Sequence, residues 1–252
     1  MKTKFLAPLV AAGLGLSALT APAQASVMTT GCAGAATCTA AELFAGGAIQ
    51  VDDFLFDGFA FNAGASDGDV MLSSDALSIT GVSGPGGSVI LDFAIDPALV
   101  LDVSDQFIDF VFDFAGAIVG GSSRLIVGAE LSFEQEVDTT VDGNPANGDF
   151  GFNEVRSTIG GVSPLEVIND SEFGFTGTDA EGGLSLTNLM IAQLISSEVF
   201  GDTGFASLSG FQLTFLLEGD LPPAEIPAPA ALPLLLSGLA GLGLYSRKKR
   251  DV

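Results

Sequence analysis

A two-residue period, with acidic residues on one parity only, recurs through the middle of the chain and constrains the fold more than any other feature. In the segment 107–114, Ile108, Phe110, Phe112 and Phe114 alternate with residues that include two aspartates. The same two-residue period, with the acidic residues on one parity, recurs at 89–96, 125–134 and 211–218. This period is typical of antiparallel strands that bury one face and expose the other. These four segments are therefore predicted to be strands that cover one core.

Weaker strand patterns fill most of the remaining chain. Shorter strands are predicted at 48–53, 54–61, 77–82, 148–155, 172–176 and 184–195, separated by turns rich in Gly, Asn, Asp and Pro. The segment 184–200 is also compatible with a helix, because its periodicity does not distinguish the two. One short helix is predicted at 39–44, where Thr39 and Glu42 have the spacing of a capping box.

The strand pattern and the content of large apolar side chains predict a single core. Of the 20 phenylalanines in the chain, all except Phe5 lie between residues 26 and 226. About ten strands over such a length are enough for one well-packed domain. We expect an all-β fold, an antiparallel two-sheet sandwich of the jelly-roll type, as one domain over residues 26–218.

The first 25 residues have the features of a secretory signal peptide. Lys2 and Lys4 precede an apolar run over 5–19. Ala23, Gln24 and Ala25 then give the small-x-small form of a cleavage site, so we expect the mature chain to begin at Ser26. The alternative is an uncleaved N-terminal anchor, which the short apolar run disfavours.

The last 27 residues combine a proline motif, an apolar segment and a basic end. In order, these are Ile226-Pro227-Ala228-Pro229, the uncharged segment 228–245, and Arg247-Lys248-Lys249-Arg250. As a transmembrane helix, 228–245 would span roughly 27 Å, close to the thickness of a bilayer core. The basic cluster would stay cytoplasmic, which places the preceding domain outside, joined through a short linker at 219–225. The alternative is a buried core helix that ends in a solvated basic tail.

Together, the two ends resemble the PEP-CTERM substrates of exosortase from exopolysaccharide-producing Gram-negative bacteria. The resemblance rests on the motif 226–229, the Gly/Leu-rich segment after it and the basic cluster 247–250, with Ala228 where the family name has Glu. It implies transit of the inner membrane, brief retention by the tail, and recognition near Pro227 and Pro229 by an exosortase-type membrane protease. Release to the cell surface or the extracellular matrix would follow. The resemblance covers about a tenth of the chain and does not extend to the domain.

Removing both ends leaves a strongly acidic chain. Residues 26–226 contain two arginines, Arg124 and Arg156, against 30 acidic residues, a net charge of −28. This charge argues against nucleic acid and anionic membrane surfaces as partners, because binding to phosphate relies on Lys and Arg. It is compatible with a self-repelling soluble surface or with divalent cations held by carboxylates.

Three groups of acidic residues are candidate calcium ligands. They are Asp52-Asp53 with Asp57, Ser66-Asp67-Gly68-Asp69, and Asp138 with Asp142. None has the twelve-residue spacing of an EF-hand loop. We therefore predict no cofactor and no specific metal site, although calcium would be compatible with these groups.

The two cysteines, Cys32 and Cys38, are predicted to form a disulfide. An isolated pair in an exported chain most simply bonds to itself. A zinc or redox site is disfavoured, because the chain has no histidine and the spacing is not Cys-x-x-Cys.

The residue inventory argues against catalysis. Without histidine, no Ser-His-Asp or Cys-His unit can form, and residues 26–226 contain no lysine. A glycosidase with two carboxylates is the remaining enzymatic alternative. We predict a non-enzymatic surface or extracellular-matrix protein associated with exopolysaccharide or biofilm. The main alternative is a calcium-assisted carbohydrate-binding or adhesin module.

Overall fold

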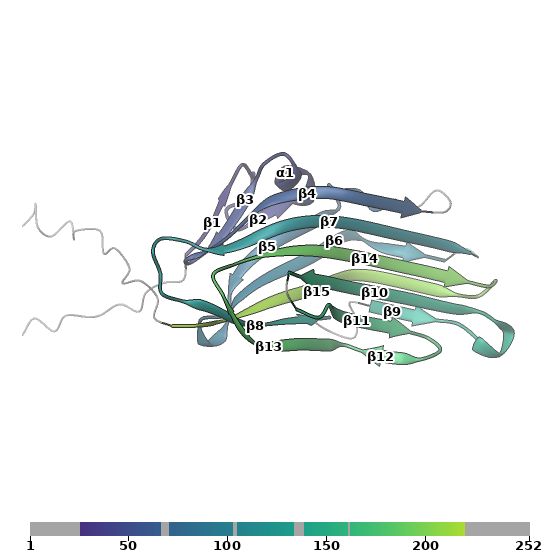
Figure 1. The fold of residues 1–252 in the computed structure, drawn as a ribbon. Coiled ribbons are helices and arrows are strands. Elements are labelled where there is room, and N and C mark those ends of the chain that lie inside the picture. The colour runs from purple at the N-terminus through teal and green to yellow at the C-terminus, as the bar shows by residue number, and fades with distance from the viewer. Residues whose placement is uncertain (1–25, 67–70, 103–104, 134–138, 161, 220–252) are drawn as a thin grey trace, which may run out of the picture.

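The structure is a computed structural model that describes residues 26–66, 71–102, 105–133, 139–160 and 162–219. These residues form two layers of long strands, with a short helix beside one layer (Figure 1). Among them, no helix is long and apolar enough to cross a bilayer. The predicted signal peptide and the predicted sorting segment, with its motif 226–229 and basic end 247–250, lie outside the described residues.

Two antiparallel sheets make up the fold of the described residues. The eight-stranded sheet has the order β1 (Val27–Thr30), β3 (Ala48–Val51), β4 (Phe54–Ser66), β7 (Gln106–Ile118), β14 (Asn188–Phe200), β10 (Phe150–Ile159), β11 (Leu165–Asp170) and β12 (Gly174–Thr176). The seven-stranded sheet has the order β13 (Thr178–Leu186), β8 (Leu125–Ser132), β15 (Phe205–Glu218), β6 (Val89–Leu101), β5 (Leu77–Ser83) and β2 (Thr37–Thr39), with β9 (Thr139–Asp142) also paired to β15. The predicted all-β sandwich of two antiparallel sheets is confirmed.

The four segments with this period form strands, in β7, β6, β8 (as far as Ser132) and β15. In β8 the buried parity changes, from Ile126 and Gly128 to Ala129 and Leu131. The predicted helix is also present as α1 (Ala40–Phe44). Thr39 Oγ1 accepts a hydrogen bond from the Glu42 amide, and the Glu42 carboxylate accepts one from the Thr39 amide. Short 3-10 turns occur at η1 (Pro85–Gly87) and η3 (Pro145–Asn147). The predicted disulfide between Cys32 and Cys38 is formed, with 5.2 Å between the two Cα atoms.

The helical alternative for 184–200 is wrong, and the predicted strand 184–195 divides at Thr187 into the end of β13 and the start of β14. The core side of β14 carries Gln193 and Ser197 among its apolar residues, both fully buried. These polar residues on the buried parity obscure the two-residue period in the sequence. Pairing of β14 with both β7 and β10 supplies the tertiary contacts that fix this segment as a strand.

Phenylalanine side chains fill the space between the sheets. Phe54 and Phe56 of β4 lie 5.3 and 5.6 Å from the ring of Phe215 on β15, measured between ring centroids. Phe93 of β6 similarly contacts Phe112 of β7 across the core, at 6.2 Å. Each of these five rings is fully buried. A buried phenylalanine contributes roughly 1.5–3 kcal/mol through removal from water, so this layer is the main attraction between the sheets.

The Asn153 side chain inside the sandwich is hydrogen-bonded through both its amide nitrogen and its oxygen. The buried Asn153 amide donates to Thr139 Oγ1 and to the Ser207 carbonyl, both at 2.9 Å. Its side-chain oxygen accepts from Ser197 Oγ at 2.6 Å. These bonds link β10 to β14 in its own sheet and to β9 and β15 in the other. Because a buried polar group without a partner is costly, they also specify how the strands align.

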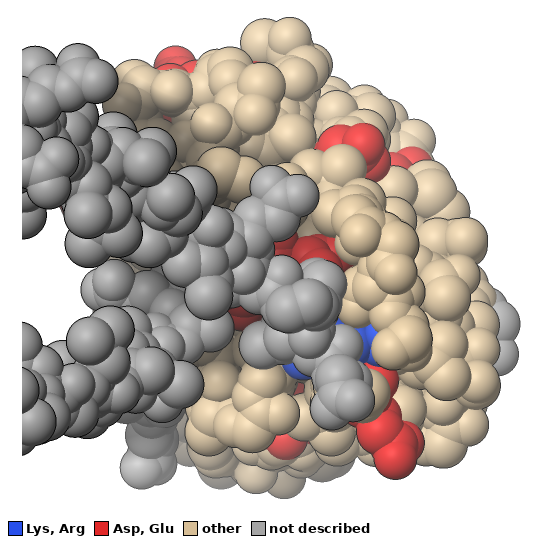
Figure 2. All heavy atoms as spheres, turned by 90° about the vertical axis from the view of Figure 1, so that its left-hand side faces the viewer, with Lys and Arg blue, Asp and Glu red and all other residues tan. Residues whose placement is uncertain are grey.

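A buried ion pair closes one end of the sandwich. Arg124, which is 2% exposed, directs Nη1 to Asp53 Oδ1 at 2.8 Å, and Nη2 donates to the Gly87 carbonyl. Asp53 lies in the turn between β3 and β4, and Gly87 lies in η1 between β5 and β6. One guanidinium therefore ties together loops from both sheets. Figure 2 looks onto this end of the molecule, where scattered acidic side chains surround a small basic area.

Replacing Arg124 with methionine should destabilise the protein by about 3–5 kcal/mol, because Asp53 is then left as a buried charge without a partner. The double variant Arg124→Met/Asp53→Leu should recover most of that loss. Both are measured by urea unfolding. Equal losses in the single and the double variant would show that packing, and not the unpaired carboxylate, sets the cost.

Candidate functional site

The solvent side of the eight-stranded sheet, which we call the outer face, gathers polar side chains in register. Asp109 of β7 lies beside Ser196 of β14, which lies beside Glu154 of β10. In the adjacent row, Arg156 of β10 lies beside Glu166 of β11. Strand alternation turns all five side chains away from the core, yet each is half-buried. The outer face is thus a partly desolvated polar surface on a rigid sheet.

Four phenylalanines extend this surface toward one end of the strands. Phe107 and Phe152 flank Glu198 across β7, β14 and β10. In the next row Phe150 and Phe200 are register partners, with ring centroids 4.4 Å apart in a stacked arrangement. All four rings are half-buried and lie outside the core. Aromatic rings beside a carboxylate provide both an apolar platform and a hydrogen-bond acceptor.

Arg156 holds two glutamates on the outer face. Its Nε and Nη2 donate to Glu166 Oε1 at 3.0 and 2.5 Å, and Nη2 also lies 2.7 Å from Glu154 Oε1. The contact with Glu154 lacks good hydrogen-bond geometry, since the guanidinium fork is directed at Glu166. Arg156 therefore pairs primarily with Glu166.

Glu154 and Glu166 are in different protonation environments as a result. Burial is the main cause that raises the pKa of Glu154, against the opposing charge of Arg156. Together with a smaller contribution from a hydrogen bond with Glu166, it brings the pKa to about 7. The hydrogen bond from Arg156 lowers the pKa of Glu166. The Arg156 guanidinium lies between the two carboxyl groups, with Nη2 at 2.7 Å from Glu154 Oε1 and 2.5 Å from Glu166 Oε1. A glycosidase instead holds the sugar between carboxyl groups roughly 5–10 Å apart. This pair does not have the geometry of a glycosidase.

Glu198 adds a second acidic position on the same face. Burial raises the pKa of Glu198, and the nearby charge of Asp109 raises it further. Asp109 Oδ1 accepts a hydrogen bond from Ser196 Oγ at 2.7 Å, which orients its carboxylate. The outer face therefore offers fixed acceptor oxygens beside exposed aromatic surface.

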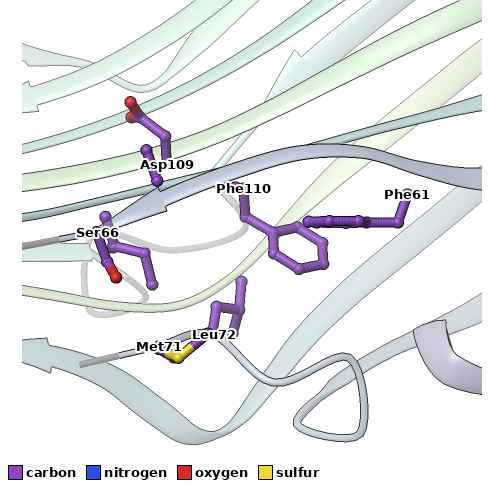
Figure 3. Close-up of a pocket in the computed structure, with 9 residues that line it drawn as sticks. Phe61, Ser66, Met71, Leu72, Asp109 and Phe110 are labelled. Atoms are coloured by element: carbon purple, nitrogen blue, oxygen red, sulfur yellow. The ribbon is translucent and has the colours of Figure 1, made fainter. Parts of the chain in front are cut away.

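An apolar pocket of about 270 Å³ opens near Asp109, between the far end of β4 and the segment that carries Met71 and Leu72. Phe61, Phe110 and Leu72 converge on it, while the Asp109 carboxylate points away from them (Figure 3). The carboxylate thus belongs to the outer face, and the pocket itself is lined by apolar groups. A second opening, of about 340 Å³, lies on the other side of Met71 and Leu72.

The acidic groups that were candidate calcium ligands are not assembled into a metal site in the part of the chain that the structure describes, where no group of three His, Cys, Asp or Glu could hold a metal ion. The Asp53 carboxylate pairs with Arg124, and Asp142 Oδ1 accepts a hydrogen bond from the Gly143 amide at 2.8 Å. Asp57 is exposed. The remaining members Asp67, Asp69 and Asp138 lie outside the described residues.

Sequence reasoning did not single out the outer face. The signal was present in β10, where Phe150, Phe152, Glu154 and Arg156 occupy alternate positions and must share one side of a strand. The order in which β7, β14 and β10 lie side by side could not be read from the sequence. That order brings Glu198 between two rings and Arg156 beside Glu166.

Comparisons with known proteins leave the function open. No family model and no curated protein matches the sequence. A solved structure of TmCBM61 in complex with beta-1,4-galactotriose is similar at 13% sequence identity, over 64% of this chain and 90% of that chain, with a TM-score of 0.22. A likeness at this level carries no argument about the fold or the ligand of this chain.

The raised pKa of Glu154 predicts a specific pH dependence of stability. Between the ordinary value of 4.5 and about 7, the unfolded chain has lost this proton while the folded chain keeps it. Glu154 therefore makes the free energy of unfolding fall as pH rises through that window. In Glu154→Gln, unfolding at pH 5 and pH 8 should show a smaller fall than in the wild type. The exposed Glu218→Gln serves as the control and should keep the wild-type fall; an unchanged fall in Glu154→Gln would contradict the assignment.

Proposed function

We propose that this chain is an exported, non-enzymatic protein of the cell surface or extracellular matrix, whose sandwich binds polysaccharide on the outer face. The observation that carries the proposal is the placement of four half-buried phenylalanines around Glu198, next to Asp109. Sugar rings stack their apolar faces on aromatic rings, and their hydroxyls donate to carboxylates. Because residues 26–226 carry a net charge of −28, a polyanionic polysaccharide is disfavoured.

Export is supported by the features of residues 1–25 and by the Cys32–Cys38 disulfide, since disulfides persist in oxidising compartments. The sorting resemblance adds membrane insertion of 228–245, recognition of 226–229 by an exosortase-type protease, and release. The jelly-roll description of the domain belongs to the same proposal. It is supported by a chain path that passes between the sheets from β4 to β5, from β6 to β7 and from β7 to β8.

The two alternatives have less support. A calcium-assisted module would need oxygen ligands free to converge on an ion, whereas Arg156 and Ser196 already engage the outer-face carboxylates of Glu166 and Asp109. A paired-carboxylate glycosidase would need space for the sugar between its carboxyl groups, whereas the Arg156 guanidinium lies between those of Glu154 and Glu166. We therefore propose a polysaccharide-binding role without metal or catalysis.

The intact mass of the native protein, recovered from the surface or medium of its own host, tests export and sorting. We expect the mass of a chain that begins at Ser26 and ends near Pro227–Pro229, plus any covalent attachment. Retention of Arg247–Val252 would show that the tail is a permanent anchor and that the sorting proposal is wrong.

Affinity gel electrophoresis in the host's own exopolysaccharide tests the binding face. Phe152→Ala should weaken retardation by roughly five- to tenfold, because one ring of the platform is lost. The matched control is Leu216→Ala, which truncates an exposed apolar side chain on β15 of the other sheet. Equal retardation of the wild type and both variants would exclude the outer face, and EDTA should change none of the values.

A further inference from the structure

The turn between β3 and β4 holds two consecutive aspartates, and each engages a different part of the chain. Asp53 pairs with Arg124. Asp52 instead contacts Ser26, the first described residue of the domain. The Ser26 backbone nitrogen donates a hydrogen bond to Asp52 Oδ1 at 2.9 Å. The Asp52 amide in turn donates to the Ser26 carbonyl at 2.8 Å, and Ser83 Oγ donates to Asp52 Oδ2 at 2.8 Å. The carboxylate is therefore oriented from both oxygens toward Ser26.

The strand that follows Ser26 is fixed in place. Val27 pairs with Val51 at the start of the β1–β3 ladder. On the core side, Val27 and Val51 pack over Gly81 of β5, where an added Cβ would lie 2.6 Å from Val51 and 3.4 Å from Val27. The position of the Ser26 nitrogen relative to Asp52 is thus set by the pairing of β1 with β3.

We infer that the Asp52 carboxylate is a binding site for the α-ammonium group of a mature chain that begins at Ser26. This inference rests on the proposed export, because signal cleavage after Ala25 converts the Ser26 amide nitrogen into a primary ammonium at the same position. A cleaved chain then gains an ion pair where the precursor has only a neutral hydrogen bond. Charge-assisted hydrogen bonds are shorter and stronger than neutral ones.

Of the chains that cleavage near residue 25 could produce, only the one that begins at Ser26 places its α-ammonium group at Asp52. A chain that begins at Val27 lacks the nitrogen that Asp52 receives, and a chain that begins at Ala25 or earlier places its charge elsewhere. The charge of Asp52 can be removed by substitution with asparagine. Asp52 has a φ of 55°, a backbone conformation that asparagine adopts readily. Asp52→Asn therefore removes the charge without straining the backbone.

Amine acetylation of the native, processed protein tests the ion pair between the α-ammonium group and Asp52. Residues 26–226 contain no lysine, so the α-amine is their only primary amine. At pH 7, acetylation of the N-terminal peptide, followed by mass spectrometry, should be roughly two- to fivefold faster in Asp52→Asn than in the wild type, as expected for loss of a surface ion pair. Asp57→Asn, on an exposed side chain of β4, is the matched control and should react at the wild-type rate.

Acetylation should also lower the melting temperature of the wild type and leave that of Asp52→Asn unchanged. This second measurement compares the melting temperatures of acetylated and unmodified protein of the same sequence. A difference in stability between the variants therefore does not affect it. Equal acetylation rates and equal changes of melting temperature in the wild type and Asp52→Asn would overturn the proposed ion pair. A native chain that begins at another residue would overturn it as well, whereas a chain that retains residues 1–25 would overturn the export proposal itself.

Discussion

The packing of phenylalanine rings between the two sheets is the interaction on which the rest of the structure depends. Phe54 and Phe56 from one sheet meet Phe215 from the other, and Phe93 meets Phe112 further along. No strand of a sandwich is stable alone, so the outer face exists only because the opposite side of each strand is held in this layer. The rings also explain how a domain without tryptophan obtains large buried apolar surfaces.

Charge is the second constraint, because the domain has very few cations to balance its carboxylates. Arg124 is buried against Asp53 at one end of the sandwich, and Arg156 joins Glu154 and Glu166 on the outer face. The first arrangement holds loops together, and the second shapes a surface. Other described carboxylates, such as those of Asp57 and Glu218, are exposed to solvent, where mutual repulsion favours a dispersed protein.

Much of the fold could be predicted because alternation is a local signal. The strands β6, β7, β8 and β15 carry their acidic residues on one parity, and the capping box at Thr39 and Glu42 marks α1. The signal was ambiguous where the core itself is polar, as at Gln193 and Ser197 in β14, because the partners of those groups lie on other strands. The outer face could not be predicted for a related reason. Its residues come from β7, β10, β11 and β14, and only the strand order brings them together.

The scarcity of basic residues has a consequence for survival outside a cell. Trypsin-like proteases cut after Lys or Arg and require several residues of accessible, extended backbone in their cleft. Between residues 26 and 226 the only basic residues are Arg124 and Arg156. Arg124 is buried, and Arg156 lies within β10, which pairs with β11 on one side and β14 on the other. The folded domain thus presents these enzymes with no usable cleavage site, a property that would suit the proposed export.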